Sequence, residues 1–222
     1  MRTTRGWLAC LTVASTLGGA GCASYGAGGG PAPVVVNVGK PGEASTTSSM
    51  ADAGRGVTLP FSEGDVAFMS GMISHHAQAI EMVDLLKTRT ESESMRMLAL
   101  RIEVSQNDEI AMMRRWLEDR KQPLPSEHAH HMPGGMMPGM LTSEEMVTLA
   151  EAKGTAFDRL FLEGMIKHHG GALVMVQDLF NSPGSAQQAE IFDFASHVDA
   201  DQRMEIARMT QMLKDLPKGD IR

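Results

Sequence analysis

The stretch DVAFMSGMISHHAQAIEMV, residues 65–83, recurs in a similar form as DRLFLEGMIKHHGGALVMV at residues 158–176. The two copies align without a gap at an offset of 93 residues. Further along the chain, an offset of 96 aligns Gln106, Glu109 and Met113 with Gln202, Glu205 and Met209. Because the offset changes by only three residues, the sequence indicates a tandem duplication of one unit, with a small insertion in its turn.

Each copy of this stretch has the spacing of a helix with one broad buried face. Apolar residues and one histidine recur every three or four positions, at Phe68, Met72, His75, Ala79, Met82 and Leu86. This spacing is typical of a helical seam. A second seam runs beside the first, through Met69, Ile73, His76, Ile80 and Val83.

A second helix follows in each unit and carries polar residues on its inward stripe. The stripes are Ile102, Gln106, Glu109, Met113 and Trp116 in the first unit, and Val198, Gln202, Glu205, Met209 and Met212 in the second. We expect Trp116 to pack in the core rather than to serve as a platform for a cation. Two helical hairpins joined by one long connection predict an all-α protein, a four-helix bundle.

Signals for helix starts agree with this prediction. A hydroxyl side chain followed three residues later by an acidic or amide side chain is typical of an N-terminal capping box. This signal occurs at Ser62–Asp65, Thr90–Glu93, Thr142–Glu145 and Ser185–Gln188. The third pair predicts a short extra helix within residues 141–154, in the connection between the two hairpins.

The first 21 residues have the features of an export signal. Arg2 and Arg5 precede an apolar run that is short for a bilayer span, and small residues lead to Cys22. The ending GAGC resembles a bacterial lipobox, in which the cysteine is lipidated and becomes the first residue. We favour a lipid anchor at Cys22 over ordinary signal cleavage near Ala20.

The predicted signal places the protein in the cell envelope, as a membrane-anchored lipoprotein facing the periplasm or the exterior. Residues 22–60 are rich in Gly, Pro and Ser, which predicts a flexible tether. The folded body, a bundle over residues 61–216, follows this tether.

Cysteine content and charge restrict the chemistry. The chain has two cysteines, Cys10 inside the signal and Cys22, so the exported chain has neither an internal disulfide nor a cysteine metal site. Any metal must therefore be held by His, Met, Asp, Glu or Gln. The formal net charge is -7, which makes the chain a poor candidate for binding nucleic acid. The sequence leaves the oligomeric state open, a homo-oligomer included.

Four histidines lie inside the apolar seams, at two repeat-equivalent positions: His75, His76, His168 and His169. Burying an imidazole is costly unless the ring is hydrogen-bonded or bound to a metal. The inward polar residues of the other two helices are expected to bind or orient these rings, namely Gln106, Glu109, Gln202 and Glu205. The alternative is a buried hydrogen-bond network that only fixes the register of the bundle.

The residue types favour copper as the metal. In each copy a methionine precedes the histidine pair by three and four residues, Met72 in the first and Met165 in the second. Thioethers favour Cu(I), while imidazole suits copper in either oxidation state and also zinc, which we consider the weaker candidate. The Glu-x-x-His motif of di-iron bundles does not occur within the predicted helices. Adjacent histidines point about 100° apart on a helix, so one of each pair should face the centre and the other a flank.

The connection between the hairpins includes the stretch EHAHHMPGGMMPGM, residues 127–140. Its ligand-type residues are His128, His130, His131, Met132, Met136, Met137 and Met140. Because Pro and Gly keep such a segment open, we expect a mobile loop that captures copper and delivers it to the bundle. The alternative is a flexible connector in which these side chains are incidental.

Three of these stretches carry a resemblance to a known family. FMSGMISHHAQAIEM, FDRLFLEGMIKHHGGALVM and MPGMLTSEEM resemble the bacterial secreted proteins of domain-of-unknown-function family 305, over residues 61 to about 214. The resemblance implies a ferritin-like four-helix bundle and, from some members, copper binding and copper resistance outside the cytoplasm. The family's Met-Ile-x-His-His motif falls on Met72, His75 and His76 and again on Met165, His168 and His169.

The second copy departs from the first immediately after its histidine pair. Gly170 and Gly171 stand where the first copy has Ala77 and Gln78. Two glycines within a helix are unfavourable, so we expect them to permit a close backbone approach or a kink.

Copper sequestration or transfer without catalysis is therefore the leading functional hypothesis. A metal-dependent oxidase, for example one that converts Cu(I) to Cu(II), is the alternative from a different class. A third reading is a helical interaction module whose histidines are structural.

Overall fold

The computed structural model describes residues 34–37, 44–49, 59–125, 131–132 and 135–217. The predicted signal and Cys22 lie outside these residues. The chain divides into two units, residues 1–57 and residues 58–222. Within the first unit, in the segment expected to be a tether, strand β1 (Val34–Asn37) pairs antiparallel with β2 (Thr46–Ser49).

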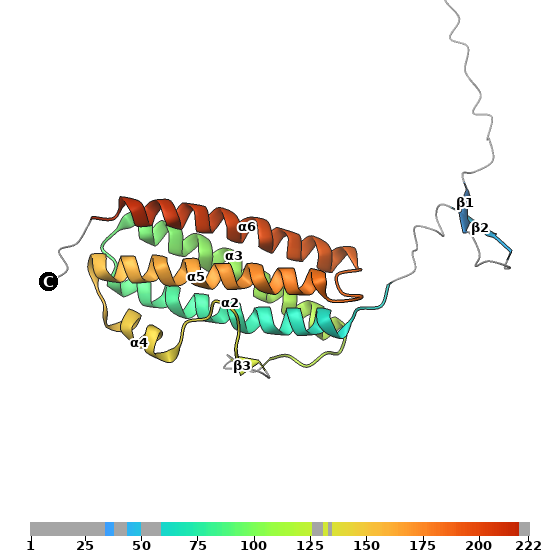
Figure 1. Ribbon diagram of the computed structural model, residues 1–222, viewed down its shortest axis with the longest axis horizontal. Coiled ribbons are helices and arrows are strands. Elements are labelled where there is room, and N and C mark those ends of the chain that lie inside the picture. The colour runs from blue at the N-terminus through green and yellow to red at the C-terminus, as the bar shows by residue number, and fades with distance from the viewer. Residues whose placement is uncertain (1–33, 38–43, 50–58, 126–130, 133–134, 218–222) are drawn as a thin grey trace, which may run out of the picture. The chain divides into compact units, whose positions relative to one another are not determined.

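The second unit contains the four-helix bundle expected from the sequence. Helices α2 (Glu63–Arg89) and α3 (Glu93–Asp119) form the first hairpin. Helices α5 (Gly154–Asn181) and α6 (Ala189–Asp215) form the second, and α2 lies alongside α5 (Figure 1). The long connection includes the short strands β3 (His131–Met132) and β4 (Gly135–Met136) and the extra helix α4 (Ser143–Glu151).

Two of the four expected helix starts are confirmed. Ser62 and Thr142 each form a complete capping box, with Asp65 and Glu145 respectively. The other two predictions were wrong by a few residues, because the hydroxyls of Thr90 and Ser185 form other hydrogen bonds and do not cap the helices that follow them. Helix α3 is capped by Ser92, while Thr90 ends α2 and accepts a hydrogen bond from the Ser92 amide.

The start of α6 was also misplaced. Gln188, not Ser185, occupies the N-cap position, and its side chain makes no capping hydrogen bond. Ser185 is buried and its hydroxyl lies 2.7 Å from that of Ser62, so it joins the α5–α6 turn to the start of α2. The inserted residues indicated by the changing offset lie in this turn, which is longer than the α2–α3 turn.

The bundle has two apolar clusters. One contains the N-terminal halves of α2 and α6 and the C-terminal halves of α3 and α5, including Met72, Trp116 and Met175. The other contains the opposite halves, including Met82 and Met165. Trp116 is buried as expected, but the Arg120 guanidinium also lies 4.2 Å from its ring centroid, so it additionally serves as a cation platform.

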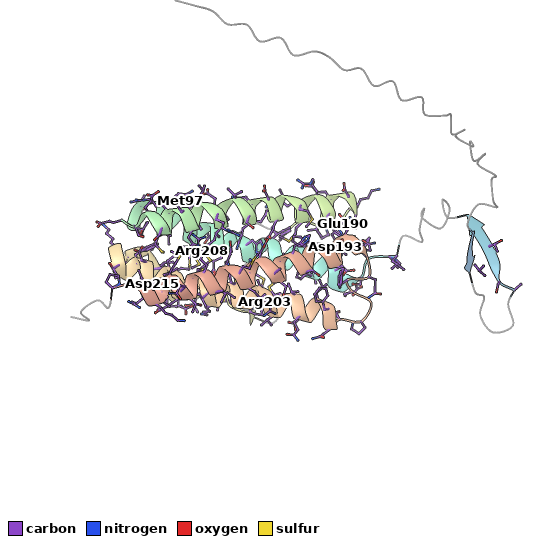
Figure 2. All side chains as sticks on the ribbon, turned by 90° about the horizontal axis from the view of Figure 1, so that it is seen from above. Met97, Glu190, Asp193, Arg203, Arg208 and Asp215 are labelled. Atoms are coloured by element: carbon purple, nitrogen blue, oxygen red, sulfur yellow. The ribbon has the colours of Figure 1, made fainter. Side chains whose placement is uncertain are left out.

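A set of polar residues separates the two clusters along every long helix. We call this set the polar layer, and its members are His75, His76, Gln106, Glu109, His168, His169, Gln202 and Glu205. Charged side chains such as Arg203 and Asp215 are instead on the outer surface of the bundle (Figure 2). The interior polarity of the bundle is therefore concentrated at the middle of its length.

Candidate metal centre

All four histidines of the polar layer are buried. Their exposed fractions are 1% or less. The helix seams predicted from the sequence place the central histidines, His75 and His168, at the α2–α5 contact. They direct the flanking histidines, His76 and His169, toward the second helix of their own hairpin. Burial of all four rings agrees with their positions in the apolar seams, and the flanking histidines contact α3 and α6.

His75 and His168 meet at the centre of the bundle. Their ring centroids are 3.9 Å apart, and the ring planes differ by 36°. Nε2 of His168 donates to the backbone carbonyl of His75 at 2.9 Å. Nε2 of His75 donates to the carbonyl of Pro138 in the connection, at 3.0 Å.

The flanking histidines each contact a carboxylate. Nε2 of His76 lies 2.6 Å from Glu109 of α3, and Nε2 of His169 lies 2.7 Å from Glu205 of α6. Arg101 lies 3.7 Å from the other oxygen of Glu205. The two carboxylates expected to orient the imidazoles are therefore placed to do so. The ion pair of Arg101 with Glu205 was not expected from the sequence.

The hydrogen bonds leave one nitrogen of every ring available. Carbonyl and carboxylate oxygens accept, so Nε2 carries the hydrogen in each case and Nδ1 of a neutral ring has a lone pair. None of the four buried Nδ1 atoms has a hydrogen-bond partner in the described part of the chain. Metal-ligating histidines commonly show this pattern, with the other ring N–H donated to a carboxylate or carbonyl.

The central histidines are neutral at physiological pH. Burial is the main cause that lowers the pKa of His75 to about 3, and the neighbouring His76 lowers it further. Burial likewise holds the pKa of His168 well below its usual value, with a second contribution from His75. Neutral imidazole is the form that binds metal ions.

The two glutamines of the polar layer are buried but incompletely bonded. Neither amide atom of Gln106 has a partner among the described residues, nor does the Oε1 atom of Gln202. Buried amide groups without partners are rare in folded proteins. The polar layer as a whole therefore has more hydrogen-bonding and ligand capacity than its internal contacts use.

The donor set fits a soft or borderline metal better than a hard one. Met72 and Met165 are fully buried, one in each apolar cluster next to the histidines. Within the described ranges, no three His, Cys, Asp or Glu side chains are arranged to hold one ion. A site here would need imidazole nitrogen together with thioether sulfur, a combination that suits copper.

The described end of the connection packs on the bundle instead of forming the open loop expected from its Pro and Gly content. Met137 and Met140 are buried in the first apolar cluster, whereas Met136 is 43% exposed. The expectation of a mobile loop was therefore wrong for residues 137–141, which pack on the bundle. His128 and His130 lie outside the described residues; His131 and Met132 form β3, which pairs with β4.

Two positions just after the histidine pairs hold this segment. The side-chain amide of Gln78 donates to the Leu141 carbonyl at 2.9 Å and accepts from the Leu141 amide at 2.8 Å. At the equivalent position of α5, Gly171 lies so close to Pro138 and Gly139 that a β-carbon would overlap them. The close backbone approach expected at the glycines is thus found at Gly171. The sequence shows Gln78 only as a difference between the two copies and does not predict its hydrogen bonds to Leu141.

Comparison with known proteins agrees with the motifs and the fold. The domain of unknown function DUF305 matches residues 65–213. This chain belongs to the DUF305 family. A secreted DUF305 protein from Streptomyces coelicolor shares 29% identity, with a TM-score of 0.61 over 68% of this chain and 93% of that chain. A DUF305 fragment from Deinococcus radiodurans shares 30% identity, with a TM-score of 0.61 over 71% and 99%.

The DUF305 chain is also similar to CopM, a protein solved with bound metals. The Cu(I)-bound form of CopM shares 27% identity, with a TM-score of 0.55 over 68% of this chain and 96% of CopM. The Cu(II)-bound form shares 29% identity with a TM-score of 0.57, and Ag-bound forms match as well. No curated protein is significantly similar to this chain. In the described part of the chain, no helix has both the length and the apolar character to span a bilayer.

Proposed function

We propose that this DUF305 protein binds copper in the cell envelope, without catalysis, and sequesters it or passes it on. The observation that carries the proposal is the set of four buried Nδ1 atoms without partners, on rings whose Nε2 atoms are already bonded to oxygen. The copper- and silver-bound forms of CopM support the choice of metal.

His75, His76, His168 and His169 are the residues proposed to hold copper, with Met72 and Met165 as the nearest thioethers in sequence. Glu109 and Glu205 hold the flanking rings in the tautomer that exposes Nδ1 to a metal. Gln106 and Gln202 provide further polar atoms in the same layer. Copper is the cargo in this proposal, and zinc is a weaker competitor because it gains less from thioether sulfur.

Residues of the connection are proposed as an accessory region that collects copper. They are His128, His130, His131, Met132 and Met136, of which Met136 is exposed. Met137 and Met140 belong to the packed part of the segment and are buried in the first apolar cluster. Delivery to the envelope would depend on residues 1–21, and lipidation of Cys22 would attach the protein to a membrane.

The main competing interpretation treats the histidines as structural. It is favoured by the four short Nε2 contacts, each of which would stabilise the bundle without metal. It does not account for the Nδ1 atoms, because burying an unpaired ring nitrogen has a cost that an apolar side chain would avoid. An oxidase would require turnover of Cu(I) under oxygen. Exposing the Cu(I)-loaded protein to oxygen after the anaerobic loading would test for it.

The test compares the copper content of the wild-type protein and two variants after anaerobic loading with Cu(I) and dialysis against a competing chelator. In His75→Leu/His168→Leu, side chains of similar size replace the central rings and remove two of the Nδ1 atoms. The control is His197→Leu, since His197 is exposed on α6. We expect the double variant to lose copper and the control to retain it, with circular dichroism reporting the helix content of both. Equal copper retention by all three proteins would contradict the proposal.

A further inference from the structure

A separate methionine-lined pocket opens beside the segment that covers the histidines. Its volume is about 280 Å³, and its lining includes Met136, Met140 and Met146. Met136 ends β4, Met140 follows it in the packed segment, and Met146 lies on α4. Gln78 and Glu81 of α2 also line the pocket.

We infer that this pocket is the entry site for monovalent copper, held by the thioethers of Met136, Met140 and Met146. The inference rests on the proposed function, and it adds an oxidation state and a route. Met146 was not among the residues that the sequence identified as ligands, because it lies outside the His/Met-rich stretch.

The chemistry of the lining selects the ion. Three thioethers line the pocket, and none of the described residues that line it contributes an imidazole or a thiol. Thioether sulfur is a soft ligand that prefers Cu(I) and Ag(I) to Cu(II) or Zn(II). The acidic side chain of Glu81, which also lines the pocket, favours a positively charged occupant.

The three methionines differ in exposure in the way an entry site requires. Met136 is 43% exposed, Met146 is partly buried, and Met140 is 1% exposed. An incoming ion therefore meets the Met136 side chain first, and Met140, the most buried of the three, belongs to the first apolar cluster. This order leads from solvent toward the interior.

The pocket and the polar layer share one segment of backbone. Met140 is two residues from Pro138, whose carbonyl accepts from His75. Leu141, which follows Met140, is bonded at both its amide and its carbonyl by Gln78, one helical turn beyond His75. The segment that contributes Met140 to the pocket is thus the same segment whose Pro138 carbonyl holds the His75 ring.

Silver provides a direct test, because Ag(I) resembles Cu(I) and does not change oxidation state. The full chain, labelled with ¹³C at the methionine methyl groups, is titrated with Ag(I) and followed by NMR. We expect the methyl signals of Met136, Met140 and Met146 to shift first, and those of Met97 and Met204 to stay unchanged. Met97 and Met204 are 54% and 55% exposed on α3 and α6, away from the pocket, and Met97 is visible on the outer side of α3 (Figure 2). Zn(II) should shift none of the three.

A variant completes the test. Met136→Leu/Met140→Leu/Met146→Leu keeps apolar side chains of similar size and removes the three sulfurs. We expect it to lose the early Ag(I) binding and to load Cu(I) several-fold more slowly. First shifts at other methionines, or an unchanged loading rate, would overturn the inference.

The histidine variant separates this inference from the proposed function. If His75→Leu/His168→Leu retains the early shifts of Met136, Met140 and Met146, the pocket binds Ag(I) independently of the polar layer, and the inference holds even if copper content shows no dependence on the histidines. If those shifts vanish in this variant while its fold is intact, the pocket is no independent site and the inference fails.

Discussion

His75 and His168 occupy equivalent positions in the two halves of the chain, and their rings stack against each other at 3.9 Å between centroids. Equivalent residues of a duplicated unit meet only where a local two-fold axis passes between the copies. The polar layer is therefore placed at the axis that relates the two hairpins. Each hairpin contributes one central ring, one flanking ring and one carboxylate to it.

Apo-protein stability should fall as the pH decreases below the usual pKa of histidine. The pKa of His75 is lowered from 6.5 to about 3, chiefly by burial, and that of His168 is lowered as well. Between these pH values the unfolded chain binds protons that the folded chain does not. The free energy of unfolding should therefore be fully retained above about pH 6.5 and decrease below it by up to about 1.4 kcal/mol per pH unit for each histidine.

Urea unfolding of metal-free protein at about pH 7.5 and about pH 5 measures this dependence. Glu145, whose pKa is lowered chiefly by its hydrogen bond with Lys167, adds to the same trend at lower pH. The control is therefore His75→Leu/His168→Leu, in which the decrease should be smaller. An equally steep decrease in that variant would show that the buried histidines do not cause it.

Gly171→Ala and Gly170→Ala should have opposite effects although the residues are neighbours on α5. A β-carbon at Gly171 would overlap the Pro138 carbonyl and Gly139, whereas one at Gly170 meets no atom within 4 Å. We expect Gly171→Ala to reduce the free energy of unfolding by about 1–3 kcal/mol, through displaced backbone. Gly170→Ala should increase it by up to about 1 kcal/mol, because alanine favours the helix. Thermal and urea unfolding of both variants measure the difference.

Gln78→Leu should loosen the packed segment. The variant removes both side-chain hydrogen bonds to the Leu141 backbone and leaves a buried amide and a buried carbonyl unbonded. The expected loss in the free energy of unfolding is about 2–3 kcal/mol. Hydrogen exchange at the Leu141 amide should become faster. Gln211→Leu is the matched control, since Gln211 is exposed and, among the described residues, bonds Asp215 alone. A comparable loss there would remove the case for a special role of Gln78.

Glu109→Gln should weaken copper binding without removing a proposed ligand. The amide can no longer hold His76 by a charge-assisted hydrogen bond, so the ring is oriented less firmly. The expected fall in affinity is about 10- to 100-fold. Competition with a chromogenic Cu(I) chelator measures it. Glu103→Gln, on the same helix but paired with Lys87, should leave the affinity unchanged, and an equal fall in both variants would argue for a general charge effect.

Sequence reasoning identified the elements and most of the interior, because duplication and helical spacing are local properties. It predicted both hairpins, the extra helix and the inward positions of Gln106 and Glu205. It failed at the starts of α3 and α6, where several hydroxyl residues compete to cap the same turn. At Trp116, Arg120 adds a contact from four residues further along, at the end of the same helix, a spacing at which side chains meet.

The sequence by itself determined that two copies of one unit fold as helical hairpins and that each brings a histidine pair to its buried face. Only the tertiary structure decided that His75 stacks on His168 and that the segment 137–141 packs on the bundle beside His75. The reason is that helix seams depend on residues three and four positions apart, whereas these contacts join residues far apart in the chain. The pair Gln78 and Gly171 shows the difference: one holds the segment 137–141 with an amide, and the other makes room for it by having no side chain.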